Sequence, residues 1–314
     1  MSSAYFLTRD SCPVCSSSDL KPLYECPYDQ PPVRDYLVDF YGSSGGVEFE
    51  YLRDARYTLA ECRNCELIFQ CEIPNDALMT KLYEQWIDPK STLARNRRQL
   101  GLTYYAGWAQ EVMQIIATFK KAPSELDVFD FGMGWSQWAL MAQAFGCNVF
   151  GTELSQARLD HASAHGITVI GWDDIPGHRF DFINAEQVFE HLADPLSVLV
   201  HLKGGLKDNG LLKISVPTAL DMDRRLKRMD WKAKKWTKKS LNAVAPLEHI
   251  NFYRRRSLAT LGALAGMREV VAPLHCQYAY TVWTGRRRFR GNLLNPIRRS
   301  LLKTDNYVFF TPVS

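Results

Sequence analysis

Between residues 126 and 217 the chain alternates short apolar runs with segments of helical periodicity, and this alternation limits its possible folds most strongly. Strands that are each followed by a helix form βαβ units, whose strands pair in parallel and carry helices on the faces of the sheet. We therefore predict an α/β fold. The expected strands are residues 126–132, 148–154, a short strand at Thr168–Gly171, 181–187 and 210–217.

The end of the chain departs from this alternation. After an expected helix over residues 257–267, two strands are predicted, one from residue 268 to 280 and one from 306 to 313. A basic segment lies between them, and we find no obvious crossover helix in it. Strands joined without a crossover pair as a hairpin, so we expect an antiparallel strand at the end of an otherwise parallel sheet.

Two CxxC pairs stand at the start of the chain, Cys12-Pro-Val-Cys15 and Cys62-Arg-Asn-Cys65. Each CxxC turn directs two thiolates to one point, and two such turns complete a tetrahedral Zn–S₄ site. A site with four cysteine ligands is closed, so we predict a structural zinc. The alternative is four free structural cysteines, and Cys26 or Cys71 could replace one of the named ligands.

The zinc interpretation depends on a reducing compartment. The N-terminus has no basic region followed by an apolar run, so we expect no signal peptide. No segment approaches the roughly 18 uninterrupted apolar residues of a membrane helix. We therefore expect a cytoplasmic protein, in which paired cysteines are more often metal ligands than disulfides. The net charge of +4 is too small to indicate a nucleic-acid partner.

Changes in composition along the chain predict three parts. Residues 1–73 hold six of the eight cysteines and little helical periodicity, which is typical of a small module held by metal. Residues 74–121 should be a helical connection, with a helix beginning near Asn75 and a longer one over 91–121. Residues 122–314 should be the α/β domain, with a basic insertion at 221–245.

A glycine-rich loop follows the first expected strand of the α/β domain. It reads Asp130-Phe131-Gly132-Met133-Gly134-Trp135-Ser136 and opens a helix. Glycines let the backbone turn tightly and approach a ligand closely, and a helix N-terminus offers N–H groups to it. Glu153 ends the next expected strand, where a carboxylate can accept hydrogen bonds from both hydroxyls of a ribose.

These segments, with the EHLADP run at residues 190–195, resemble the class I S-adenosylmethionine-dependent methyltransferases. The resemblance covers about residues 122–314 and implies a Rossmann-like sheet of seven strands, mostly parallel, with the last strand antiparallel. It places Asp130, Gly132 and Gly134 along the methionine part of S-adenosylmethionine, Glu153 on its ribose, Asp173 at its adenine and Gln187 on the floor of the pocket. The sequence departs from the family at Ser136, where a third glycine is usual, and Trp135 is large for this loop.

A four-cysteine zinc module ahead of such a domain resembles enzymes that methylate deoxysugars on nucleotide carriers. This resemblance implies a small-molecule acceptor, a sugar or glycan precursor, in bacterial surface-polysaccharide or natural-product synthesis. The C-methylating members carry a further C-terminal domain, and this chain ends at residue 314, so the reaction on the sugar stays open.

Two Glu-His pairs follow the fourth and fifth expected strands, on the sheet edge where open α/β folds bind ligands. The second pair resembles the substrate site of the sugar methyltransferases, so we take His249 as the catalytic base and Glu248 as a residue that positions the acceptor or the imidazole. His191 is the second candidate. Either histidine could instead be structural.

Residues 221–240 hold nine Lys or Arg and three Asp, with Trp231 and Trp236 among them. This composition suits a lid over the diphosphate and base of a nucleotide sugar. It also suits RNA, an anionic membrane or a solvated helix. Two other functions are therefore weighed: an RNA methyltransferase that uses the zinc module and the basic lid, and an inactive zinc-ribbon adaptor. Nothing in the sequence indicates an oligomeric state.

Overall fold

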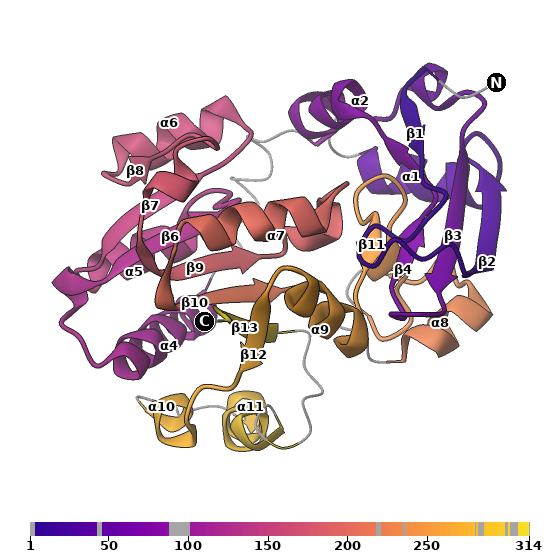
Figure 1. Cartoon of the computed structure of the whole chain (residues 1–314). Coiled ribbons are helices and arrows are strands. Elements are labelled where there is room, and N and C mark those ends of the chain that lie inside the picture. The colour runs from indigo at the N-terminus through magenta and orange to yellow at the C-terminus, as the bar shows by residue number, and fades with distance from the viewer. Residues whose placement is uncertain are drawn as a thin grey trace. The chain divides into compact units, whose positions relative to one another are not determined.

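A computed structural model divides the chain into two compact units, which are described separately below (Figure 1). Unit 1 comprises residues 1–94, 189–196 and 216–261, and unit 2 comprises 95–188, 197–215 and 262–314. The structure describes residues 4–42, 46–87, 101–217, 221–234, 237–279, 281, 286–298, 301 and 307–313. The start of the expected helix 91–121, Lys235 and Trp236 lie outside the described residues, as do the side chains of residues 286–288.

Unit 2 contains the predicted seven-stranded sheet, in the order β12-β13-β10-β9-β6-β7-β8. The central pairs are parallel, and β13 is antiparallel to both of its neighbours. The Rossmann-like fold and its antiparallel last strand are therefore confirmed. The strands are β6 (Asp127–Phe131), β7 (Asn148–Thr152), β8 (Thr168–Val169), β9 (Phe180–Glu186), β10 (Leu206–Ser215), β12 (Met267–Val270) and β13 (Tyr307–Pro312).

Side chains on both faces of this sheet are buried, as a parallel sheet requires. Val128 and Phe182 pack with α4 and α5 through Val112 and Trp138, while the alternate residues Phe129 and Ile183 are also fully buried. The helices that contribute residues to this unit are α4 (Leu102–Phe119), α5 (Gln137–Ala144), α6 (Gln156–Ala164), α7 (Pro195–Gly204), α9 (Arg255–Leu264), α10 (Leu274–Tyr278) and α11 (Arg286–Ile297).

The connection between the last two strands was predicted wrongly. Strand β12 ends at Val270, where Ala272 and Pro273 follow, and the next residues form α10 instead of continuing the strand. Pro273 has no N–H to donate to a strand ladder, and its fixed φ suits the residue before a helix. The basic segment contains a second helix, α11, so β12 and β13 are not joined as a simple hairpin.

Unit 1 is built on a four-stranded sheet in the order β11-β4-β3-β2, with a separate pair of strands, β1 and β5. Its core is rich in aromatic side chains, among them Tyr28, Tyr41, Tyr57 and Trp86. The strands are β1 (Phe6–Thr8), β2 (Leu20–Pro27), β3 (Arg56–Cys62), β4 (Ile68–Gln70), β5 (Glu72–Pro74) and β11 (Asn251–Phe252). The helices are α1 (Val33–Tyr41), α2 (Asp76–Lys81) and α8 (Met222–Arg228).

The N-cap expected at Asn75 is present, because its side chain accepts a hydrogen bond from the N–H of Leu78 at 3.1 Å. The compact units follow other boundaries than the sequence ranges do. Strand β11 pairs with β4, so residues 216–261 fold with the N-terminal segment. Among the described helices, none is long and apolar enough to cross a membrane.

Candidate functional site

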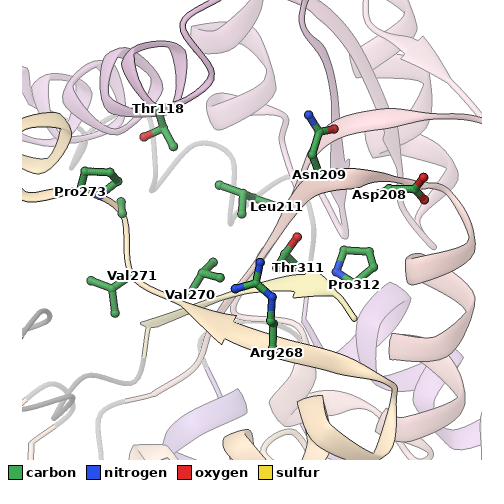
Figure 2. Close-up of a pocket in the computed structure, with 11 residues that line it drawn as sticks. Thr118, Asp208, Asn209, Leu211, Arg268, Val270, Val271, Pro273, Thr311 and Pro312 are labelled. Carbon is green, nitrogen blue, oxygen red and sulfur yellow. The ribbon is translucent and has the colours of Figure 1, made fainter. Parts of the chain in front are cut away.

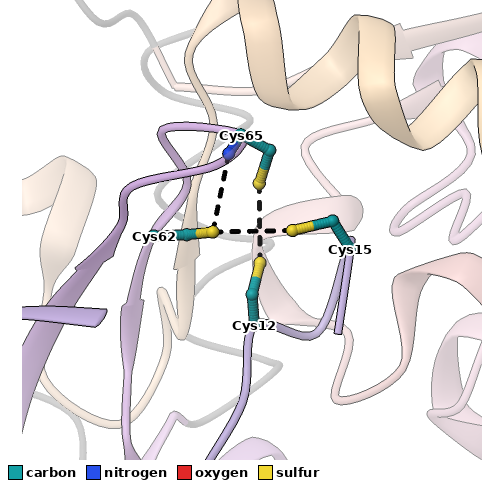
Figure 3. Close-up of side chains that lie close together, drawn as sticks. All are labelled: Cys12, Cys15, Cys62 and Cys65. Carbon is teal, nitrogen blue, oxygen red and sulfur yellow. Dashed lines mark hydrogen bonds between the residues drawn. The ribbon is translucent and has the colours of Figure 1, made fainter. Parts of the chain in front are cut away.

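The four cysteines of the two CxxC pairs converge on one point in unit 1 (Figure 3). Their sulfur atoms all lie within 4.8 Å of one another. The Sγ atoms of Cys12 and Cys65 are 3.5 Å apart, as are those of Cys15 and Cys62. Four sulfurs at 2.3 Å from a tetrahedral zinc would be about 3.8 Å apart, so this donor set fits a Zn–S₄ centre.

Two tight turns of the same kind produce this convergence. Ser16 and Glu66, each directly after the second cysteine of a pair, adopt left-handed backbone conformations with φ of 56° and 65°. The N–H of each donates back to the carbonyl of the first cysteine, at 2.9 Å and 2.8 Å. Both pairs therefore have the same knuckle geometry, which the CxxC spacing alone predicts.

The glycine-rich loop of unit 2 leaves β6 at Phe131. Gly132 and Gly134 both have positive φ, 68° and 55°, which glycine adopts without strain. A Cβ at Gly132 would lie 2.7 Å from Cγ2 of Val188, whereas a Cβ at Gly134 would meet nothing within 4 Å. A larger residue at position 132 would therefore clash within unit 2. The space beside Gly134 is open.

Glu153 follows β7 and turns its carboxylate to the glycine-rich loop. Its Oε2 accepts a hydrogen bond from the N–H of Gly134 at 2.8 Å, and its Oε1 accepts one from the N–H of Leu154 at 2.9 Å. Arg158 forms an ion pair with it at 3.4 Å. An ionised carboxylate accepts about four hydrogen bonds, so these partners leave capacity for a ribose hydroxyl.

Asp130 lies inside the sheet of unit 2 and is 3% exposed. Its Oδ1 accepts a hydrogen bond from Nδ2 of Asn184 at 2.7 Å. Burial raises the pKa of Asp130 to about 7, although the Asn184 bond and the nearby Lys213 act in the opposite direction. The carboxyl group therefore resists ionisation, which favours a structural or hydrogen-bonding role over that of a fixed charge.

The other predicted cofactor residues occupy loops at the carboxyl ends of their strands. Gln187 has φ of 55°, and its Nε2 lies 3.4 Å from Oγ of Ser215, the last residue of β10. Asp173 is exposed in the loop after β8. Sequence reasoning missed two apolar surfaces near these positions. Leu154 is 91% exposed beside Glu153, and Trp172 is 41% exposed and stacks on His201 at 3.9 Å.

The two histidines proposed as catalytic residues come together within unit 1. The ring centroids of His191 and His249 are 4.9 Å apart. Nδ1 of His249 bonds to the carbonyl of Asn242, and Nδ1 of His191 lies 2.7 Å from the carbonyl of Glu248. A carbonyl accepts only from N–H, so each neutral ring carries its proton on Nδ1 and its lone pair on Nε2.

The side chains of Tyr83 and Glu190 contact this histidine cluster. The Tyr83 hydroxyl lies 3.0 Å from Nδ1 of His191, and Oε1 of the buried Glu190 lies 3.9 Å from its Nε2. The Glu248 carboxylate accepts a hydrogen bond from the Tyr41 hydroxyl at 2.8 Å. The tautomer of His249 is set by the Asn242 backbone, so Glu248 is not needed for that part of its expected role.

A buried polar framework, which sequence reasoning missed, holds both Glu-His segments. Nε2 of Gln70 donates to the carbonyls of Ala245 and His249, both at 3.0 Å. Nδ2 of Asn251 donates to the carbonyl of Leu192 at 2.7 Å. Gln70 ends β4, which begins shortly after Cys65, and β11 with Asn251 pairs with β4. The strand next to the cysteine cluster therefore positions the histidines.

The basic segment is only partly the exposed lid that its composition predicts. Trp231 packs against Tyr24, Tyr36 and Tyr57 in the aromatic core of unit 1, with ring centroids 5.5–5.7 Å away. It is therefore partly buried against the core of unit 1 and is not an exposed stacking platform. Lys234, Lys238 and Lys239 are exposed.

A separate cavity of about 480 Å³ lies in unit 2, away from the glycine-rich loop (Figure 2). Residues from the first half of β10, from β12 and the segment after it, and from the end of β13 line it together with Thr118 of α4. Asp208 and Arg268 are its charged side chains, and Thr118, Asn209 and Thr311 are its other polar ones. None of the residues predicted from the sequence to bind a cofactor lines this cavity.

Comparison with known proteins shows the family of the chain. The chain belongs to the methyltransferase domain family, which matches residues 102–271. A ubiquinone biosynthesis O-methyltransferase from Bradyrhizobium sp. (strain ORS 278) is 29% identical over an alignment of 151 residues that covers 44% of this chain. A second, from Bradyrhizobium diazoefficiens, is 28% identical over the same length. The matched region spans 59% of each of these relatives.

Solved structures with similar folds are more distant in sequence. The plantazolicin methyltransferase BpumL, in complex with SAH, is 14% identical at a TM-score of 0.48, covering 76% of this chain and 95% of its own. CalS10, an amino pentose methyltransferase from Micromonospora echinaspora, is 21% identical at a TM-score of 0.33, covering 39% of this chain and 54% of its own.

Proposed function

We propose that the protein is an S-adenosylmethionine-dependent methyltransferase that binds its cofactor at the glycine-rich loop of unit 2. The observation that carries this proposal is the loop itself. Gly134 faces open space in a left-handed conformation, and its N–H is bonded to the carboxylate of Glu153 at the end of the neighbouring strand. Family membership supplies the reaction class.

The cradle around this loop has the chemistry that the cofactor requires. When bound, S-adenosylmethionine supplies an electrophilic methyl group. Glu153 would accept hydrogen bonds from the ribose hydroxyls, and Asp173 would accept one from the adenine amine. The exposed Leu154 offers an apolar surface beside Glu153 on which an adenine ring can lie. Gln187 would line the floor of the pocket. These groups bind and orient, which is the main contribution of a protein to methyl transfer.

An acceptor hydroxyl must lose its proton as its oxygen takes the methyl group. We propose that Nε2 of His249 accepts that proton. The hydrogen bond to Asn242 leaves the lone pair on this nitrogen, and an imidazole has a reference pKa of about 6.5, suited to a base near neutral pH. His191 is the alternative base. Glu248 would hydrogen-bond the acceptor, while its other partner, Tyr41, keeps it oriented.

The acceptor that we propose is a sugar or glycan precursor on a nucleotide carrier. Carboxylate and imidazole groups suit sugar hydroxyls, and exposed lysines of the basic segment suit a diphosphate. The relatives named for ubiquinone biosynthesis favour a second candidate, the hydroxyl of another small molecule. We propose that zinc at Cys12, Cys15, Cys62 and Cys65 has a structural role, because four thiolates leave it no open position.

The test is methyl transfer from radiolabelled S-adenosylmethionine to three sets of acceptors: nucleotide sugars, catechol-type phenols and RNA. We expect label in nucleotide sugars, and we expect calorimetry to show cofactor binding in the absence of acceptor. Label in phenols alone or in RNA alone would show that the proposed acceptor class is wrong. The protein would still be a methyltransferase. No cofactor binding to folded, zinc-loaded protein would overturn the assignment and favour an inactive adaptor.

A further inference from the structure

Helix α11 of unit 2 exposes large apolar side chains in a cluster. Phe289, Leu293, Leu294 and Ile297 are 40–46% exposed, and Leu301, just beyond the helix, is 74% exposed. Single exposed apolar residues are common on protein surfaces, but a contiguous group marks an interaction site.

The spacing of these residues places them on one side of the helix. Leu293 and Ile297 are four positions apart, and Phe289 precedes them by four more. Four residues advance an α-helix by one turn and about 40°, so the three side chains form a continuous stripe. Leu294 is three positions before Ile297, so it lies beside that residue and widens the stripe. We call Phe289, Leu293, Leu294 and Ile297 the apolar stripe.

Other groups of α11 attach the helix to its own unit. Pro296 is buried, and the Asn292 side chain is 3.4 Å from that of Gln110 on α4. The Tyr278 hydroxyl of α10 donates to the carbonyl of Leu293 at 2.8 Å. These contacts fix the orientation of the helix, so the apolar stripe is presented to solvent by a docked helix and not by a loose segment.

The charged residues of α11 itself are all positive. Arg290 and Arg298 are exposed within and just after the helix, and the helix begins with Arg286-Arg287-Arg288. From residue 281 to 303 the sequence holds no Asp or Glu. Arg290 is four positions before Leu294 and therefore lies on the same side as the apolar stripe, and Arg298 follows at its border. A helix that exposes Leu, Ile and Phe together with arginines has the composition of helices that lie in a membrane interface.

We propose that α11 is a binding surface for anionic phospholipid bilayers, with the apolar stripe in the acyl boundary and the arginines at the headgroups. RNA would satisfy the arginines but would leave three aliphatic side chains without a partner. The combination of apolar and basic groups matches the two components of a lipid surface. This proposal does not depend on methyl transfer, since binding is measured without cofactor or acceptor.

The test is co-sedimentation of the full-length protein with vesicles of phosphatidylcholine containing 30% phosphatidylglycerol, against vesicles of pure phosphatidylcholine. We expect binding to the anionic vesicles that weakens with salt. Arg290→Gln with Arg298→Gln should lower the partition coefficient roughly fivefold for each arginine. Leu293→Gln with Ile297→Gln should lower it about tenfold or more.

Matched control variants change the same chemistry elsewhere in unit 2. Leu102→Gln removes an apolar side chain that is 86% exposed on α4, and Lys120→Gln removes an exposed charge at the end of that helix. Both should leave vesicle binding unchanged, and circular dichroism melting should show that all variants fold. Equal binding to neutral and anionic vesicles would overturn the proposal. So would binding that survives both α11 variants, or RNA binding that only the arginine variant removes.

Discussion

The cysteine cluster of unit 1 and the glycine-rich loop of unit 2 differ in how far each is prepared for its ligand. The four sulfurs are already at nearly the separations of a Zn–S₄ centre, held by two identical turns. In the loop, Glu153 bonds to the N–H of Gly134 and pairs with Arg158. The thiolates of the first have no competing charged partner among the contacts described, and they already converge, whereas a ribose must share a carboxylate that already has partners.

Because of this difference, we expect the metal to affect the free energy of folding and the cofactor to affect only its own free energy of binding. A structural metal contributes its binding free energy to folding, because the site exists only in the folded chain. A cofactor that shares an occupied carboxylate gains only the difference between the new and the existing hydrogen bonds. Loss of a cysteine should therefore affect the whole of unit 1, and loss of Glu153 should affect binding alone.

The largest expected effect is that of Cys62→Ser. It leaves three thiolates, and we expect the zinc content to fall from one per chain to well below that. Structural zinc contributes about 10–16 kcal/mol in isolated zinc-finger peptides, so a loss of even part of this should unfold or loosen unit 1. Metal analysis and thermal melting measure both changes.

The matched control is Cys71→Ser, since Cys71 lies in the same unit but outside the cluster. It should keep the metal and the melting temperature. Wild-type protein purified without chelators and holding no zinc would show that the cysteines are structural without metal, and the contrast between the two units would disappear.

The next largest effect is expected on kcat, when the proposed base His249 is changed. His249→Asn keeps a side-chain N–H that can donate to the Asn242 carbonyl and removes the Nε2 lone pair. If His249 is the base, kcat should fall about 10²–10⁴-fold with unchanged cofactor affinity, and the loss should shrink at high pH, where the acceptor ionises more easily.

The same change at His191 tells the two candidates apart. His191→Asn should lower kcat much less. Full activity in His249→Asn would end this assignment, and an inactive His191→Asn enzyme with normal cofactor affinity would transfer the role to His191.

A smaller effect is expected at the glycine-rich loop. Glu153→Ala should weaken S-adenosylmethionine binding by about 1–3 kcal/mol, measured by calorimetry, because a charge-assisted pair of hydrogen bonds is lost. Glu153→Gln keeps one acceptor oxygen and should lose less. Unchanged affinity in both would place the pocket elsewhere. Gly132→Val is unsuitable for this test, because its side chain would clash with Val188 and disturb the fold.

The sequence predicted the elements that local pattern determines. The parallel strands of unit 2, the cap at Asn75 and the convergence of the cysteines all follow from periodicity or fixed spacing. The sequence did not predict the roles of residues whose contacts are far away along the chain. Gln70 reads as an ordinary polar residue at a strand end, and only the fold shows that it holds the carbonyl of His249, far along the chain. The basic neighbours of Trp231 predict a lid residue, but three tyrosines from other segments pack against it.

The smallest expected effect concerns the remaining exposed part of the basic segment. Neutralising Lys234, Lys238 and Lys239 to Gln removes three exposed charges, and exposed charges act on a ligand through water and screening salt. We expect a rise of a few-fold in KM for an anionic acceptor, with cofactor affinity and the melting temperature unchanged. Because the effect is one of charge, it should decrease as ionic strength rises and be absent for an uncharged acceptor. An equal rise in KM for charged and uncharged acceptors would instead indicate that the segment acts through packing, as Trp231 does, and would make this part of unit 1 scaffold and not substrate lid.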